Sequence, residues 1–370
     1  MDNLSSSSSS SMSDMELSSD DEFDLFEERD RPKNQNYFQE TIPSYNDEEF
    51  YEHFHISRRV AESIALQFEQ SEYFHYQSGG NGKLSSLQHV LIYLWFVAHQ
   101  TASFRDVADQ FHISISSLFV IRKLTNFLSN LSHRVISWPS PEEQTVIERH
   151  FRDNDFPGVI GAIDGSHVKI DKPSNDPDSY LNRKHFFFYS GMQLLQAVCD
   201  HRKKIRDLFV GFPGSVHDSR VFRTSALFNT LPEKCHNNTY ILGDSGYPCL
   251  PNLLTPFKAR GDLTRRQSNF NLKLSKNRYV IEHCFGLLKQ KFRQLYHVKL
   301  RSIVDIVHLI RACCVLHNLA LNDHFQYEEV EDVVQHDNEV VAREFDEEEV
   351  ERDDGNGIQR RNQVANLLRF

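Results

Sequence analysis

Hydrophobic residues in the first third of the chain recur with a helical period. From Asp47 onward they fall at intervals of three and four residues, and the segment 84–100 is apolar on nearly every side, which predicts a buried helix. The segment 101–128 predicts two helices around a turn at residues 112–114, with Ser103 capping the first helix. This is the size of a helix-turn-helix DNA-binding motif, but an ordinary helical hairpin has the same pattern.

The period changes at Gly158, where runs of β-branched and aromatic residues begin that are bounded by Gly, Pro, Asp or Asn. Such runs predict strands, here over residues 159–165, 184–200, 204–214 and 240–248. Helices are predicted over residues 217–231, 275–296 and 303–321. We therefore expect an α/β core over residues 158–322, preceded by a helical region over residues 47–141.

The two ends of the chain differ from its middle in charge. Residues 1–46 and 323–370 are acidic and sparsely apolar, which predicts disordered tails. The formal net charge of the chain is -11, yet residues 51–322 alone carry about +10. A cationic centre suits the binding of a polyanion such as DNA. The tails either compete with that polyanion or act only as solubility segments.

Several classes of protein are excluded by the sequence. No run of eighteen apolar residues predicts a membrane span, and the N-terminus lacks the apolar segment of a secretory signal. The six cysteines have no paired short spacing, which argues against zinc sites and disulfides and predicts a reducing compartment. The sequence has no motif typical of nucleotide binding or of serine hydrolases.

Two acidic residues stand against apolar runs. Asp164 lies inside the run VIGAIDGSHVKI, and Asp244 ends the strand predicted in ILGDSGYP. A buried carboxylate is costly without a partner. Because a glycine closely follows each acid, the carboxylate can face a cleft while its strand stays buried. Two such acids on neighbouring strands would form an oxygen-ligand site for Mg²⁺ or Mn²⁺.

A third acid, Glu282, lies on the predicted helix 275–296. It shares one arc of that helix with the basic residues Arg278, Lys289 and Arg293. Glu282 either forms a salt bridge with Arg278 or Lys289, or points at a metal while these bases hold phosphate. Spacing alone favours the salt bridge.

The motifs that carry these acids occur in a specific order, GAIDGSHVKI, QAVCDHRKKIRDLFVGFPGSVHDSRVF, ILGDSGYP and NRYVIEHCFGLLKQKFR. In this order and spacing, roughly residues 85–322 resemble PIF/Harbinger-type transposases and the domesticated nucleases derived from them. The resemblance implies an RNase H-like catalytic core, in which Asp164, Asp244 and Glu282 form a DDE triad that binds two Mg²⁺ or Mn²⁺ ions. It also implies a helical DNA-binding segment before the core and a Myb-like DNA-binding partner protein.

The segment VHDSRVF contains a fourth acid, Asp218, in a pattern that the resemblance shares. Asp218 either lies near the metals or caps the helix that follows, where an aspartate is favoured. We therefore place it behind the three other acids as a metal ligand.

The basic residues that we expect to contact DNA phosphates are Arg122, Lys123, Arg183, Lys184, Arg278, Lys289 and Arg293. The cluster HRKKIR at residues 201–206 forms either a nuclear-localisation signal or a basic hairpin turn. The sequence thus predicts a nuclear, metal-dependent DNA nuclease or transposase without a membrane anchor, and it leaves open a homodimer and passage through the cytoplasm. The alternatives are a domesticated DNA- or chromatin-binding protein that no longer cuts DNA, and a protein-binding scaffold.

Overall fold

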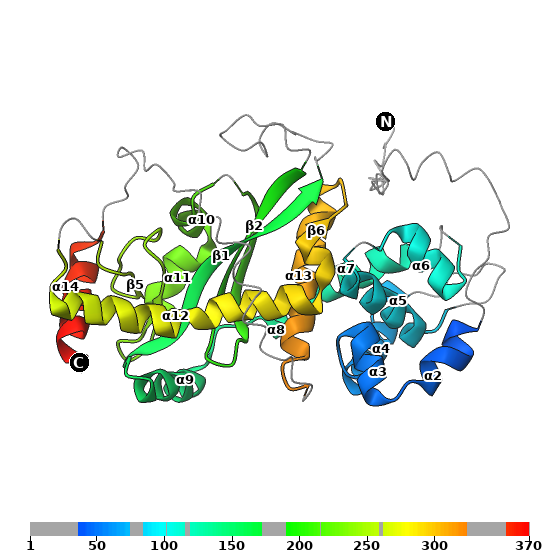
Figure 1. Cartoon of the computed structure of the whole chain (residues 1–370), viewed down its shortest axis with the longest axis horizontal. Coiled ribbons are helices and arrows are strands. Elements are labelled where there is room, and N and C mark those ends of the chain that lie inside the picture. Colours follow the sequence, from blue (N-terminus) through cyan, green and yellow to red (C-terminus); the bar gives the residue numbers. More distant parts are fainter. Residues whose placement is uncertain are drawn as a thin grey trace, which may run out of the picture.

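A computed structural model of the chain describes residues 36–74, 84–100, 102–114, 119–171, 190–214, 216–258, 262–323 and 353–369. An all-helical region lies beside a mixed sheet that is flanked by helices (Figure 1). This arrangement confirms the predicted α/β class with an RNase H-like core after a helical region. No helix of the described residues is long and apolar enough to cross a membrane.

The described residues of the helical region form nine short elements. Several of them begin at a capping box, which satisfies free backbone N–H groups. The capping boxes pair Asn46 with Glu49, Ser85 with Gln88, and Ser103 with Asp106. The described elements are η2 (Tyr37–Thr41), α2 (Ile42–Ser44), α3 (Asp47–Phe54), α4 (Arg58–Glu69), η3 (Glu72–Phe74), α5 (Ser86–Ala98), α6 (Phe104–Phe111), α7 (Phe119–Asn130) and α8 (Ser132–Val135).

The predicted N-terminal tail 1–46 is wrong at its C-terminal end. Residues 1–35 lie outside the described residues, but η2 and α2 are ordered parts of the helical region. The Tyr37 ring packs edge-on against Phe111 with centroids 5.3 Å apart, and Ile42 is buried. Two apolar side chains in an otherwise polar stretch are too sparse to show a period, so the sequence pattern missed them.

The pair α6 and α7 matches the predicted helical hairpin. Ser103 caps α6, and His112 ends it in the left-handed conformation with φ of 53°. Arg122 and Lys123, which we expect to contact DNA, are half-buried on α7, and the Lys123 amine lies 4.7 Å from the centre of the Phe119 ring.

The sheet has the strand order β3-β2-β1-β4-β5, with β6 paired to β1. Its strands are β1 (Val159–Asp171), β2 (Ser190–Cys199), β3 (Ile205–Pro213), β4 (Tyr240–Leu242), β5 (Leu253–Leu254) and β6 (His297–Val298). The first three form an antiparallel meander, whereas β4 and β6 run parallel to β1. β1 continues six residues past its predicted end because Val168 and Ile170 remain buried and paired with β2.

Among the described residues, five helices between positions 141 and 319 flank the sheet. The longest of them, α12, runs across the sheet and packs against β1 (Figure 1). They are α9 (Pro141–Asp153), α10 (Asp218–Thr224), α11 (Ala226–Lys234), α12 (Arg265–Lys291) and α13 (Ile303–Leu319). The predicted bounds of α12, residues 275–296, are wrong at both ends. The helix begins ten residues earlier, at a capping box of Thr264 with Gln267, and it ends where the buried Phe292 leaves the helical conformation.

The predicted C-terminal tail 323–370 is also partly wrong. Residues 324–352 lie outside the described residues, but α14 (Gly355–Leu367) packs against α12 and β5. Val364 is buried, and Arg361 donates hydrogen bonds to the carbonyl oxygens of Thr255 and Pro256. The sequence pattern missed α14 because this helix has few apolar residues and follows a strongly acidic stretch.

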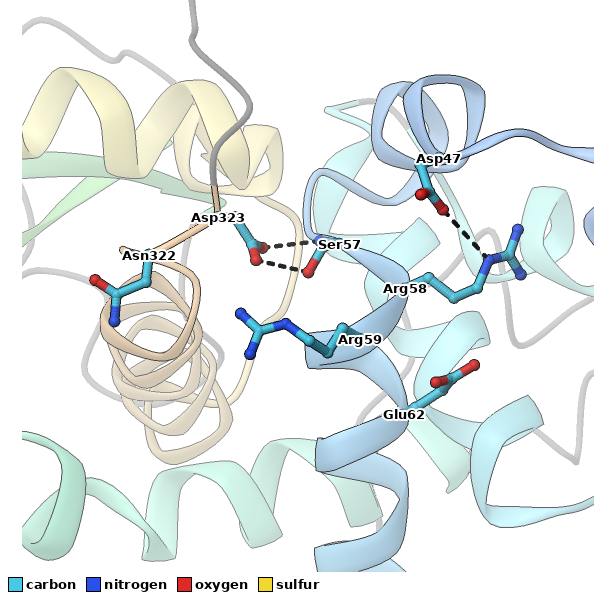
Figure 2. Close-up of a pocket in the computed structure, with 7 residues that line it drawn as sticks. All are labelled: Asp47, Ser57, Arg58, Arg59, Glu62, Asn322 and Asp323. Atoms are coloured by element: carbon cyan, nitrogen blue, oxygen red, sulfur yellow. Dashed lines mark hydrogen bonds and ion pairs between the residues drawn. The ribbon is translucent and has the colours of Figure 1, made fainter.

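The helical region and the sheet share one hydrophobic core and several polar contacts. Figure 2 shows the carboxylate of Asp323, just after α13, accepting hydrogen bonds from the Ser57 backbone N–H at 2.8 Å and hydroxyl at 2.6 Å. Nearby, His55 Nδ1 lies 2.6 Å from the carbonyl oxygen of Lys291. These contacts hold the start of α4 against the end of the α/β core.

Candidate metal centre

The candidate site lies at a gap along one edge of β1. One edge of β1 pairs with β4 over Val159–Ala162 and with β6 over Lys169–Ile170. Between these pairings, β4 has already ended, because Tyr247 N–H donates back to the Asp244 carbonyl oxygen in a turn. Asp164 lies on the open stretch of β1, and Asp244 lies two residues beyond β4. The carboxyl ends of parallel strands are where ligands commonly bind in α/β sheets.

Three carboxylates meet at this gap. Asp164, Asp218 and Asp244 each offer a carboxylate oxygen, and these oxygens lie within 4.8 Å of one another. Asp218 is the first residue of α10, and it reaches the group because β1 carries no side chain at the point of closest approach. A Cβ at Gly165 would lie 2.5 Å from Asp218 Oδ1. Gly165 therefore permits the contact between α10 and β1.

The electrostatics of the group are dominated by Asp164. Burial raises the pKa of Asp164 to about 7; Arg278 opposes this shift, and the negative charges of Asp244 and Asp218 add to it. Asp164 Oδ1 accepts a hydrogen bond from the Gly165 backbone N–H at 2.8 Å, and Oδ2 accepts one from Arg278 Nη1 at 2.7 Å. Three neighbouring carboxylates with one cation are a strong oxygen-ligand set for a divalent ion, which would relieve their mutual repulsion.

Glu282 is held apart from this group. It lies on α12 one turn after Arg278, and the guanidinium of Arg278 donates to Glu282 Oε1 through Nη2. The salt bridge that the spacing favoured is therefore present, and the same arginine also bridges to Asp164. The structure brings the predicted residues Asp164 and Asp244 together with Asp218, and it connects Glu282 to them through Arg278.

Comparison with known proteins assigns a family to this arrangement. The profile of the DDE superfamily endonucleases matches residues 163–318, which contain all four acids. Over these residues the core of this chain is similar to the DDE endonuclease superfamily. A protein named "Putative nuclease HARBI1" from Bos taurus is 31% identical over 58% of this chain and 62% of its own length. The protein of the same name from Homo sapiens is 30% identical over the same shares.

A plant protein, "Protein ALP1-like" from Arabidopsis thaliana, is 27% identical over 53% of this chain and 52% of its own length. These matches confirm the resemblance to Harbinger-derived proteins. The chain spans less than two thirds of the length of these relatives. No solved structure matches the chain significantly.

The DDE domain implies dependence on a divalent metal, and the donor set of this chain fits one. A buried aspartate with two further aspartates beside it offers hard oxygen ligands of the kind that Mg²⁺ and Mn²⁺ take. Asp164, Asp218 and Asp244 would hold such an ion. Sequence reasoning ranked Asp218 behind Glu282 because an aspartate before a helix is common; here Asp218 begins α10, and its side chain reaches the acids.

Two uncharged residues support the DDE acids, and the sequence pattern gave no reason to choose them. Gln196 on β2 donates from Nε2 to the Tyr247 hydroxyl oxygen at 2.9 Å and to the Asp218 carbonyl oxygen at 3.2 Å. Tyr247 is fully buried, and burial together with the charges of Asp218, Asp164 and Asp244 raises its pKa well above the ordinary value. The hydroxyl therefore stays protonated, and Gln196 ties β2 to both α10 and the turn after β4.

The residues predicted to contact DNA have different surroundings in the DDE core. Arg183 and Lys184 lie outside the described residues. Lys289 is buried, so it is a poor candidate for phosphate, whereas Arg293 is exposed on the short 3-10 helix η6 (Arg293–Tyr296) that follows α12. In the cluster 201–206, residues 201–204 lie in the turn between β2 and β3. Arg206 lies on β3 and is buried in an ion pair with Asp200 at 2.8 Å.

One hollow among the described residues lies away from the acids. It has a volume of about 410 Å³ and opens between the start of α4 and the end of α13 (Figure 2). Its lining includes Arg58, Arg59 and Asp323, and the four acids of the candidate site do not line it. The three clustered aspartates are themselves half-buried.

Proposed function

We propose that this protein is a divalent-metal-dependent DNA endonuclease or transposase that cleaves phosphodiester bonds. The observation that carries the proposal is the meeting of Asp164, Asp218 and Asp244 within a DDE endonuclease domain. The relatives named as nucleases support it.

Each residue has a distinct role in the proposed chemistry. Asp164, Asp218 and Asp244 hold the divalent ions, which activate the attacking oxygen and stabilise the leaving oxygen when bound. Gly165 and Gln196 position Asp218, and the Tyr247 hydroxyl fixes the turn that carries Asp244. Glu282 joins the acids from α12, as the resemblance implies. The net charge of about +10 over residues 51–322 favours the approach of DNA.

The proposal extends to partners and place of action. A DNA substrate requires access to the nucleus, and a Myb-like partner would supply part of the recognition of terminal-repeat DNA. The half-buried Arg122 on α7 and the exposed Arg293 are the described bases that we would still assign to phosphate. A homodimer would allow cleavage at both ends of an element. Strand transfer is the further step that a transposase adds to cleavage.

The test is cleavage of supercoiled and terminal-repeat DNA by the full chain with Mg²⁺ or Mn²⁺. Asp164→Asn and Asp244→Asn should each reduce cleavage by at least ~10²-fold because they remove ligand charge. Asp153→Asn, an exposed aspartate at the end of α9, is the matched control and should cleave as wild type. Cleavage that survives both acid substitutions would exclude this mechanism.

The second candidate is a domesticated DNA- or chromatin-binding protein that no longer cuts. Arg122 and Lys123 are half-buried and Lys289 is buried, so few of the basic side chains predicted to contact DNA are accessible for tight binding. This candidate predicts salt-dependent DNA binding that is equal in the wild type and the acid variants, without cleavage. A protein scaffold would show no salt-dependent DNA affinity at all.

A further inference from the structure

Arg278 has a position that neither the salt-bridge interpretation nor the metal interpretation of Glu282 describes fully. Its guanidinium donates to Asp164 Oδ2 through Nη1 and to Glu282 Oε1 through Nη2. The side chain is only 17% exposed, and the two carboxylates that it joins are 18% and 31% exposed. Arg278 thus lies between one member of the acid group and the fourth acid.

The negative charges around Arg278 stabilise its guanidinium in the bridging position. Burial alone would lower its pKa, but the negative charges of Asp164, Glu282 and Asp244 outweigh that effect and raise the pKa. A bridging guanidinium with charge-assisted hydrogen bonds to two carboxylates is a strong arrangement. Removing the arginine would leave Asp164 and Glu282 as neighbouring negative charges with a vacated cationic position between them.

A metal ion and the guanidinium would compete for the same two oxygens. Mg²⁺ requires oxygen ligands at about 2.1 Å, so one ion shared by Asp164 and Glu282 leaves no room for a hydrogen-bond donor between them. Asp164, Asp218 and Asp244 offer a position that does not need Glu282. The chain therefore has one position ready for an ion and a second that a side chain fills.

We propose that Arg278 is the resident cation of the second metal position. This inference rests on the proposed metal-dependent function and concerns how many ions the chain accepts without DNA. The first ion binds at Asp164, Asp218 and Asp244. The second ion binds between Asp164 and Glu282 only when Arg278 leaves, so Arg278 is a positioning residue that couples the second ion to a rearrangement on α12.

Calorimetric titration of the full chain with Mn²⁺ tests this count directly, without any measurement of cleavage. The wild type should bind one ion. Arg278→Gln removes the positive charge and should bind a second ion with at least 10-fold higher affinity than the wild type shows for it. Arg278→Lys keeps the charge and is the matched control, which should bind one ion. The double variant Arg278→Gln with Glu282→Gln should return to one.

The outcomes separate the inference from the proposed function. A wild type that binds no Mn²⁺ would overturn the metal-dependent function and this inference with it. A wild type that binds one ion, together with an Arg278→Gln variant that binds one ion with unchanged affinity, would overturn the inference alone, as would two ions in the wild type. If Arg278→Gln does not fold, Arg278→Met keeps the apolar stem and has the same expected count.

Discussion

Substitution of Gly165 by alanine should weaken metal binding while leaving the stability of the fold nearly unchanged. Gly165 lies within β1, and its backbone has no positive φ, so an alanine can adopt the same conformation. Its Cβ would lie 2.5 Å from Asp218 Oδ1 and 3.2 Å from both Asp218 Cγ and Leu194 Cδ1. Ordinary van der Waals contact begins near 3.4 Å, so the carboxylate must move by roughly 1 Å.

We expect Gly165→Ala to lower the affinity for the metal much more than the free energy of unfolding. Ligands need placement within about 0.5 Å, and a misplacement of about 1 Å can cost roughly 10²-fold in rate. We expect Mn²⁺ affinity to fall by about 10-fold or more, which is ~1.4 kcal/mol. Stability should change by less than about 1 kcal/mol, because alanine within a strand lowers the entropy of the unfolded chain and only a side-chain tip must move.

The assay pairs calorimetric Mn²⁺ titration with urea denaturation of the metal-free chain. Gly286→Ala is the matched control, because a Cβ there meets nothing within 4 Å on the same helix that carries Glu282. Gly286→Ala should bind Mn²⁺ as wild type. If Gly165→Ala kept wild-type Mn²⁺ affinity, Asp218 would not be a ligand. If it unfolded the chain instead, Gly165 would be a packing residue rather than one that makes room for a ligand.

Two further predictions concern the scaffold around the site. Burial lowers the pKa of His55 to about 4, so between pH 6.5 and 4 the unfolded chain binds the extra proton and stability falls as the pH falls. His55→Asn keeps a hydrogen-bond donor and tolerates the φ of 58° at this position. Between pH 8 and pH 5 the free energy of unfolding of this variant should fall by roughly 2 kcal/mol less than that of the wild type. Equal pH dependence in urea denaturation of the two proteins would refute this. Gly357→Ala would force a Cβ into the Cys249 carbonyl oxygen, undock α14 and cost about 1–3 kcal/mol in urea denaturation. Gly355→Ala, where a Cβ meets nothing within 4 Å, should be neutral, and equal stability of both variants would contradict the docking of α14.

Much of the fold follows from local pattern. The capping residue Ser103, the helical spacing of apolar residues over 101–128 and the β-branched run of β1 are all local signals, and each predicted the right element. Tertiary contacts decided the remaining boundaries. The sequence signal for α12 began at Ser275, yet the helix begins at Arg265, because its first turns pack Phe270 beneath Phe156 and Phe257.

The candidate site was predictable to the extent that its chemistry is local. Asp164 and Asp244 stand out because each breaks an apolar run beside a glycine. Asp218 could not be ranked above Glu282 from the sequence. Whether an aspartate before a helix caps that helix or faces a neighbouring strand depends here on the missing side chain at Gly165, which is 53 positions earlier in the chain but adjacent in space. The contact of Arg278 with Asp164 joins α12 to β1, and no helical spacing encodes it.

In the proposal that Arg278 occupies the second metal position, the two sequence interpretations of Glu282 describe two states of the same residue. The i, i+4 spacing that allows a salt bridge with Arg278 also fixes Glu282 on the face of α12 that Asp164 approaches. The neighbours Ile281, Cys284 and Phe285 are buried and hold the helix in place, while the Glu282 carboxylate is 31% exposed. The proposed change of partner from Arg278 to a metal would therefore be made by side chains on a helix whose buried face keeps its backbone in place.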